Sequence, residues 1–134
     1  MLERINELLG KGESFAFETT LSTRSYANLV ERAHANGYEV TLLFLALDST
    51  ELAINRVATR VREGGHNIPT DTVIRRFHNG LSNFFKIYMP IVDKWLLVNN
   101  SLAEFEFIAK GIESEVTNIN ERKWSQLNKK YHGK

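Results

Sequence analysis

The chain holds 134 residues, which suits one compact domain because most domains have about 100 to 150 residues. Its 17 lysines and arginines nearly balance its 16 aspartates and glutamates, so no overall charge directs it to nucleic acid or to an anionic membrane. The absence of cysteine excludes a disulfide framework, a thiol nucleophile and a cysteine-ligated zinc site. No apolar run approaches the ~20 residues of a membrane span, and the charged start is unlike a signal peptide, so we expect a cytoplasmic protein with no membrane partner.

Helices and strands are predicted to alternate through the first half of the chain. Helical spacing of apolar residues predicts a helix over residues 2–9, and aromatic and β-branched residues predict a strand over 15–20. A second helix is expected over about 23–35, before an apolar run over 40–47 that is typical of a central strand buried on both faces. A third helix follows over 50–63. This order predicts an α/β domain with a parallel sheet.

The second half of the chain is predicted to hold one long helix, two strands and a final helix. In chain order, these elements are expected at residues 69–90, 94–98, 105–108 and 120–131. Residues 115–118 stay unassigned. Because no repeat, low-complexity tract or linker interrupts the pattern, residues 1–134 are expected to form a single domain, with the last strand and helix in 103–134.

Arginines flank a glycine pair in the middle of the chain. Arg56 and Arg60 are four residues apart and share a helix face, Arg62 precedes Gly64-Gly65, and Arg76 lies on the following helix. Guanidinium groups on either side of a flexible turn are what a mobile lid over phosphates needs. An exposed helical hairpin, with salt bridges to acidic residues of the same two helices, explains the pattern equally well, so both interpretations stay open.

Polar side chains gather at the end of the predicted 15–20 strand. Because ligands of open parallel sheets bind outside the carboxyl ends of the strands, Glu18 and Thr20 could hold a substrate hydroxyl or a hydrated magnesium ion, and Arg24 could face the same crevice. Equally, Glu18 could be a solvated strand end, Thr20 a helix cap and Arg24 a solvent-exposed side chain.

His66 has no HxxxH partner and no cysteine nearby, so we expect a hydrogen-bonded loop residue and not a metal ligand.

Familiar nucleotide-binding motifs are absent from the 134 residues. The phosphate-binding loop GxxxxGK followed by Ser or Thr does not occur, and neither does GxGxxG.

Lysines near the carboxyl end form a basic zone. Such zones bind nucleic acid weakly without aromatic stacking, so we expect a solvated face and no nucleic-acid partner.

Several short sequence blocks form one recognisable succession. In chain order they are FAFETTLS at 15–22, GYEV at 37–40, RV at 56–57 and again at 60–61, GGHNIP at 64–69, RRF at 75–77, DKW at 93–95 and NS at 100–101. Together these blocks cover about residues 2–102 and resemble the zeta-toxin-like P-loop kinases. The combination of FETTLS with GGHNIP is the specific part of this resemblance.

The resemblance implies a three-layer α/β fold of the P-loop-kinase type, with a small, mostly parallel sheet and a lid at about residues 56–78. It also implies an ATP-dependent kinase for a small molecule, such as the nucleotide sugar UDP-N-acetylglucosamine, with ATP and magnesium as cofactors. Arg56 and Arg60 would be catalytic, because they would neutralise the transferred phosphate. The substrate side would be lined by Glu18, Thr20 and Arg24, and the nucleotide side by Arg62, His66, Arg76 and Asn100.

The chain also departs from the pattern of this family. It begins after the place of the P-loop strand, its helix and the segment with the proposed base, so we expect an N-terminally truncated member, and Asn99 stands where the family usually has aspartate. Because positioning and electrostatics supply almost all of phosphoryl-transfer catalysis, the chain alone should be a very poor kinase. The alternative is a catalytically dead module that binds a nucleotide sugar, an antitoxin-like protein or a second copy of itself across an exposed sheet edge.

Overall fold

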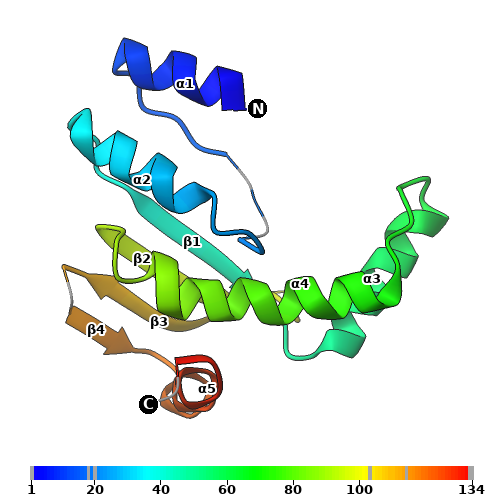
Figure 1. Cartoon of the computed structure of the whole chain (residues 1–134). Coiled ribbons are helices and arrows are strands. Elements are labelled where there is room, and N and C mark those ends of the chain that lie inside the picture. Colours follow the sequence, from blue (N-terminus) through cyan, green and yellow to red (C-terminus); the bar gives the residue numbers. More distant parts are fainter. Residues whose placement is uncertain (1, 18, 20, 103, 114, 133–134) are drawn as a thin grey trace.

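The computed structural model describes residues 2–17, 19, 21–102, 104–113 and 115–132, and its centre is a four-stranded sheet in the order β1-β2-β3-β4 (Figure 1). The strands are β1 (Thr41–Ala46), β2 (Lys94–Asn99), β3 (Glu106–Ile112) and β4 (Glu115–Asn118). The expected α/β class is confirmed. The expectation of a mostly parallel sheet is wrong beyond β1 and β2, because β2–β3 and β3–β4 pair antiparallel. Short connections, which cannot make a parallel crossover, join these last three strands.

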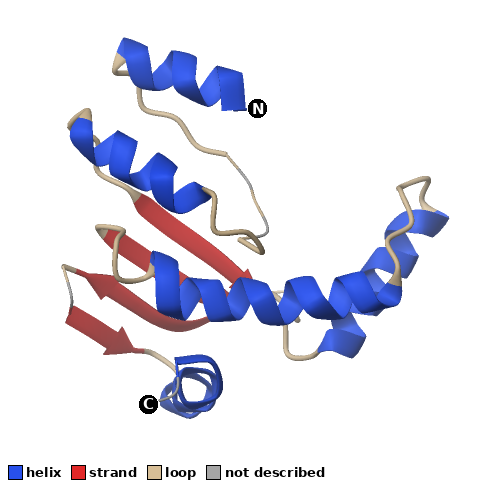
Figure 2. Ribbon diagram, in the orientation of Figure 1, coloured by secondary structure: helices blue, strands red, loops and turns tan. Residues whose placement is uncertain are grey.

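Helices lie across one face of this sheet and extend beyond its end (Figure 2). They are α1 (Leu2–Lys11), α2 (Tyr26–Ala35), α3 (Thr50–Arg62), α4 (Thr70–Asn83) and α5 (Glu121–Leu127). α4 and α5 each continue into a wider π-helical turn, η1 (Phe84–Tyr88) and η2 (Asn128–His132) respectively. The helices predicted from apolar spacing are therefore confirmed. None of the helices in the described ranges is long and apolar enough to cross a membrane.

The strand predicted over residues 15–20 is wrong for the residues of it that the structure describes, 15–17 and 19. A strand needs a neighbour that takes its backbone hydrogen bonds, and side-chain pattern alone does not supply one. The aromatic rings instead pack against rings further along the chain. Phe15 lies 6.0 Å from Tyr38, and Phe17 lies 5.6 Å from Tyr26, between ring centroids. The aromatic residues at 15 and 17 therefore indicate packing between side chains, and not a strand.

The main core covers one face of the sheet. Phe84 and Phe85 of η1 are fully buried, and Phe84 meets Trp95 of β2 edge to face, with 5.5 Å between ring centroids. Trp95 also stacks on Trp124 of α5 at 5.4 Å. On its other side the indole lies against Gly111 of β3, where a Cβ would come within 2.1 Å of Trp95 Nε1. These aromatic contacts attach η1 and α5 to the same face of the sheet.

The second face of the sheet carries apolar side chains that stay exposed. Leu45, Val98 and Phe107 are register neighbours on β1, β2 and β3, and Leu43 shares their face. Leu43, Leu45 and Phe107 are 56%, 45% and 48% exposed, whereas Val98, between Leu45 and Phe107, is buried at 1%. The prediction of a central strand buried on both faces is therefore wrong for β1, which is an edge strand in the described part of the chain. An apolar face and a strand edge without a described partner meet along β1.

Asp93 fixes the start of β2 against the start of β1. One oxygen of its carboxylate, Oδ2, accepts a hydrogen bond of 2.6 Å from Val40 N and lies 2.8 Å from His34 Nε2. The bond from the Val40 amide, followed by that from His34, holds the pKa of the Asp93 carboxyl below its ordinary value. This anchor sets the parallel register that brings Ala46 opposite Asn99 at the far end of the two strands.

Candidate functional site

The carboxyl ends of β1 and β2 lie side by side, and hydrogen bonds tie together the loops that follow them. Asn100 N donates to Ala46 O at 2.7 Å, and Asp48 N donates to Ser101 Oγ at 2.8 Å. Ligands of open α/β sheets bind outside this end of the strands. Here α3 and α4 extend beyond the sheet (Figure 1), so their inner faces continue the same surface.

A cavity of about 370 Å³ opens between these strand ends and the helices α3 and α4. We call it the arginine cavity, because Arg56 and Arg60 of α3 and Arg76 of α4 line it, together with Asn100. Arg56 is half-buried, and its guanidinium donates to the backbone oxygen of Asn100, which anchors α3 to the loop after β2. Much of the remaining lining is apolar: Ala53, Val57, Ile68, Val73, Phe77 and Leu81.

The arginines of this cavity form no ion pair with any carboxylate in the described part of the chain. Arg56, Arg60 and Arg76 therefore do not form the internal salt bridges expected of an exposed helical hairpin. Like charges that share one cavity repel one another unless an anion lies between them. Planar guanidinium groups match phosphate oxygens through paired hydrogen bonds. The cavity is thus suited to a ligand that carries phosphates.

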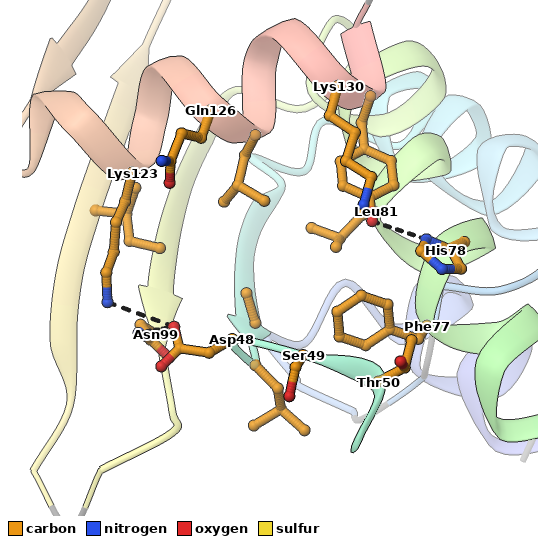
Figure 3. A pocket seen from close by; sticks show the side chains of 15 residues that line it. Asp48, Ser49, Thr50, Phe77, His78, Leu81, Asn99, Lys123, Gln126 and Lys130 are labelled. Carbon is orange, nitrogen blue, oxygen red and sulfur yellow. Dashed lines mark hydrogen bonds and ion pairs between the residues drawn. The ribbon is translucent and has the colours of Figure 1, made fainter. Parts of the chain in front are cut away.

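A second polar cluster, which we call the Lys123 network, joins Asp48, Asn99, Glu106 and Lys123. Lys123 Nζ lies 2.5 Å from Glu106 Oε1. The same nitrogen lies 3.4 Å from Asp48 Oδ1 (Figure 3). The buried Asn99 side chain donates to the same two oxygens, at 3.3 Å and 2.7 Å. Glu106 raises the pKa of Lys123, and Lys123 lowers the pKa of Glu106. The network links the ends of three strands and their loops to the last helix.

Comparison with known proteins decides the family. The family model described as "Zeta toxin" matches residues 2–122. The chain belongs to the zeta toxin family. An uncharacterized protein of Haemophilus influenzae is 35% identical over 63 residues, which are 47% of this chain and 45% of that protein, so the match spans about half the length of this curated relative. No solved structure matches the chain.

Zeta toxin membership confirms the resemblance carried by the sequence blocks. Four of the residues that the resemblance implies meet at the arginine cavity, namely Arg56, Arg60, Arg76 and Asn100. Three others line neither this cavity nor the other one described below, and all are exposed: Arg24, Arg62 and His66. The Arg62 guanidinium instead donates to Thr59 Oγ1 at 3.1 Å. Glu18 and Thr20 lie outside the described residues.

Magnesium is the cofactor that the zeta toxin family implies beside ATP. Across the ranges that the structure describes, no three His, Asp or Glu side chains gather as metal ligands do. The carboxylate of Asp48, at the end of β1, is bonded to Asn99 and paired with Lys123. This carboxylate is therefore already engaged, and Glu18, which could hold a hydrated magnesium ion, lies outside the described residues.

Sequence reasoning missed the Lys123 network. Asp48 carries a signal, because it directly follows a predicted strand, but the sequence pattern gives it no partner. Lys123 lies 75 positions further along the chain from Asp48, and no local pattern connects the two.

Proposed function

We propose that this chain forms the phosphate-binding side of an ATP-dependent kinase of the zeta-toxin type, whose acceptor is a nucleotide sugar such as UDP-N-acetylglucosamine. The arginine cavity carries the proposal, because guanidinium groups without acidic partners in the described chain meet there at the carboxyl ends of β1 and β2. Family membership supports the phosphotransferase class. Both ATP and a nucleotide sugar bear phosphates, which arginine binds through two parallel hydrogen bonds.

Each side of the cavity has a role in this proposal. Arg56 and Arg60 neutralise the charge that builds on the transferred phosphate, while Arg76 and Asn100 hold the nucleotide. For the substrate side we keep the residues that the family resemblance implies: Glu18, Thr20 and Arg24.

Arg62 and His66 belong in this proposal to a lid, and would reach the nucleotide only after the loop over residues 63–69 closes. The glycine pair suits such a hinge. Gly64 has a φ of +96°, which favours glycine, and Gly65 N donates to Arg60 O at 2.7 Å. A Cβ on Gly65 would lie 2.9 Å from that same oxygen, so a larger residue would push the loop off the end of α3.

We also propose that the chain alone binds phosphates without transferring them efficiently, because its 134 residues contain no P-loop motif.

One observation favours a second function, that of an interaction module. The exposed second face meets the unpaired edge of β1, and β1 carries no charged residue to oppose pairing with another strand. A second copy of the chain is the partner we propose, and an antitoxin-like protein is the alternative.

Calorimetric titration with Mg-ATP and with UDP-N-acetylglucosamine tests the arginine cavity. Arg56→Ala combined with Arg60→Ala should weaken Mg-ATP binding at least about tenfold, because one hydrogen bond to a charged group contributes about 1.5–3 kcal/mol. The unfolding midpoint should fall only modestly, because the substitution removes the Arg56 bond to Asn100 O but takes no side chain from the core. Arg75→Ala combined with Arg122→Ala removes the same charge from exposed positions outside the cavity, and should bind like the unmodified chain.

Two results would contradict these proposals separately. An unaltered affinity in the Arg56→Ala, Arg60→Ala variant would remove these residues from a phosphate site. Transfer of phosphate from ATP to the sugar nucleotide by the chain alone would contradict its inactivity, while leaving the arginine cavity intact.

A further inference from the structure

A second cavity, of about 440 Å³, lies against the last helix (Figure 3). We call it the C-terminal cavity. Its lining comes from the ends of β1 and β2, from β3 and α4, and from α5 with η2. Only Ala46, Leu47, Phe77 and Leu81 are shared with the arginine cavity, so these side chains form a wall between the two. The volume falls in the range of about 300–1,000 Å³ that is typical of small-molecule sites.

At one end of the C-terminal cavity, the positive charge is already neutralised. Lys123 belongs to the Lys123 network, where it pairs with both Glu106 and Asp48. A ligand anion at this end would meet two carboxylates and one ammonium group, so it would gain no net attraction.

At the other end of the cavity, donors remain available. Figure 3 shows Lys130 and His78 there, on η2 and α4. Lys130 Nζ lies 5.4 Å from the centre of the Tyr131 ring and, within the described chain, pairs with no carboxylate. The Tyr131 hydroxyl lies 2.8 Å from His78 Nδ1, which occupies that nitrogen and orients the imidazole. In the described chain no hydrogen bond engages the other nitrogen, Nε2.

The Tyr131 hydroxyl holds the His78 imidazole in place at this end of the cavity. The side chain is 8% exposed, and burial raises the pKa of its hydroxyl, so the phenol stays protonated at neutral pH. The Tyr131–His78 contact allows either direction; where the neutral phenol donates to Nδ1, the proton of the imidazole lies on Nε2, as a donor. Lys130 and His78 can then both donate to one anionic group.

Between the two ends, the lining is apolar. Leu81 and Ile108 are each 2% exposed, and Leu127 and Phe77 complete this part of the surface. A ring in contact with these side chains would be removed from water, which is favourable in proportion to the apolar area buried. An anionic group at one end and a ring beside it therefore match the two parts of the cavity.

We propose that the C-terminal cavity is a second ligand site, which binds a small aromatic anion with its charged group on Lys130 and His78 and its ring against Leu81 and Leu127. This site is independent of the proposed kinase function. It uses none of the arginines of the arginine cavity.

Nuclear magnetic resonance titration of the full chain with phenyl phosphate tests this site. The imidazole signals of His78 and the methyl signals of Leu127 should shift together and saturate. Lys130→Gln should raise the dissociation constant at least about tenfold, because it removes a charge-assisted hydrogen bond. Since Lys130 is exposed, the fold should be retained. Lys129→Gln removes the same charge from the exposed neighbouring position, which does not line the cavity, and should bind like the unmodified chain.

Three outcomes would overturn the proposal. Shifts that do not saturate would remove the site. Equal weakening in Lys129→Gln and Lys130→Gln would show attraction to a general basic surface and no defined contact. Equal affinity for inorganic phosphate and phenyl phosphate would show that the apolar part binds nothing. The Arg56→Ala, Arg60→Ala variant should keep its affinity for phenyl phosphate, so failure of the kinase proposal is distinguishable from failure of this one.

Discussion

At Gly111, the absence of a side chain lets the Trp95 indole lie against the backbone of β3. An added Cβ would come within 2.1 Å of Trp95 Nε1 and 2.3 Å of Cε2. The indole has little room to retreat, because Trp124 stacks on it at 5.4 Å and Phe84 meets it at 5.5 Å. Gly111→Ala should therefore destabilise the fold by about 3 kcal/mol or more, which urea unfolding followed by tryptophan fluorescence would measure.

A matched glycine provides the control for this prediction. Gly10 lies in α1, and a Cβ there meets nothing within 4 Å. Gly10→Ala should leave stability unchanged or raise it by up to about 1 kcal/mol, because alanine loses less backbone entropy in a helix. Similar effects of the two substitutions would mean that Trp95 does not occupy the space above Gly111.

At the scale of elements, the Lys123 network holds α5 to the ends of the strands. Lys123→Met keeps the apolar stem but leaves Glu106 and Asp48 without a cation. Lys123 holds the pKa of Glu106 below its ordinary value of 4.5, so this contribution is present above that pH and is lost as the pH falls through the lowered pKa. Glu106 holds the pKa of Lys123 above 10.5, so the same contribution is lost again as the pH rises past that value.

Thermal unfolding at several pH values tests this element-scale prediction. Lys123→Met should lower the unfolding midpoint at pH 7 by less than Gly111→Ala does, because the paired groups are partly exposed. The difference from the unmodified chain should shrink as the pH is lowered through the depressed pKa of Glu106. Arg122→Met, on the exposed side of α5, is the control and should behave like the unmodified chain. A difference that stays constant with pH would show that Lys123 acts only through packing.

Elements with a local signal were predictable from sequence, whereas those that depend on a distant partner were not. The apolar spacing of α3 and α4 and the continuous apolar run of β1 lie within short stretches of chain, so the predicted presence of these elements is confirmed. The predicted burial of β1 on both faces is wrong, because the position of a strand within the sheet depends on distant partners. Residues 15–17 have strand composition but no neighbouring strand. The direction of β3 depends on its short connection to β2, which residue pattern does not encode. For the site, helical spacing placed Arg56 and Arg60 together on α3, but the contacts of Lys123 join segments that no periodicity relates.

At the scale of the whole molecule, the two edges of the sheet differ. β4 has an acidic residue, Glu115, and exposed positions throughout, whereas β1 is uncharged and presents Leu43 and Leu45. Charged residues on an edge oppose strand addition, so we expect self-association through β1. Sedimentation equilibrium should show a monomer–dimer equilibrium, and Leu43→Lys should raise its dissociation constant at least about tenfold.

The opposite edge supplies the control for self-association. Val116 of β4 is 47% exposed, comparable with Leu43 at 56%, so Val116→Lys adds the same charge at a similarly exposed position. It should leave the dimer unchanged. A chain that stays monomeric at every concentration, or equal effects of the two lysines, would exclude β1 as the contact.

The parallel pairing of β1 with β2 also has a consequence for biosynthesis. Thr41 pairs with Lys94, so the partner of β1 is made 53 residues later, whereas β2, β3 and β4 follow one another closely. At ~5–20 residues per second, a ribosome needs roughly 3 to 10 seconds to make this intervening stretch. Throughout that interval the uncharged segment from Thr41 to Ala46 has no strand beside it. The yield of folded protein in a cell should therefore depend on how well chaperones shield this segment during translation, more than on the stability of the finished fold.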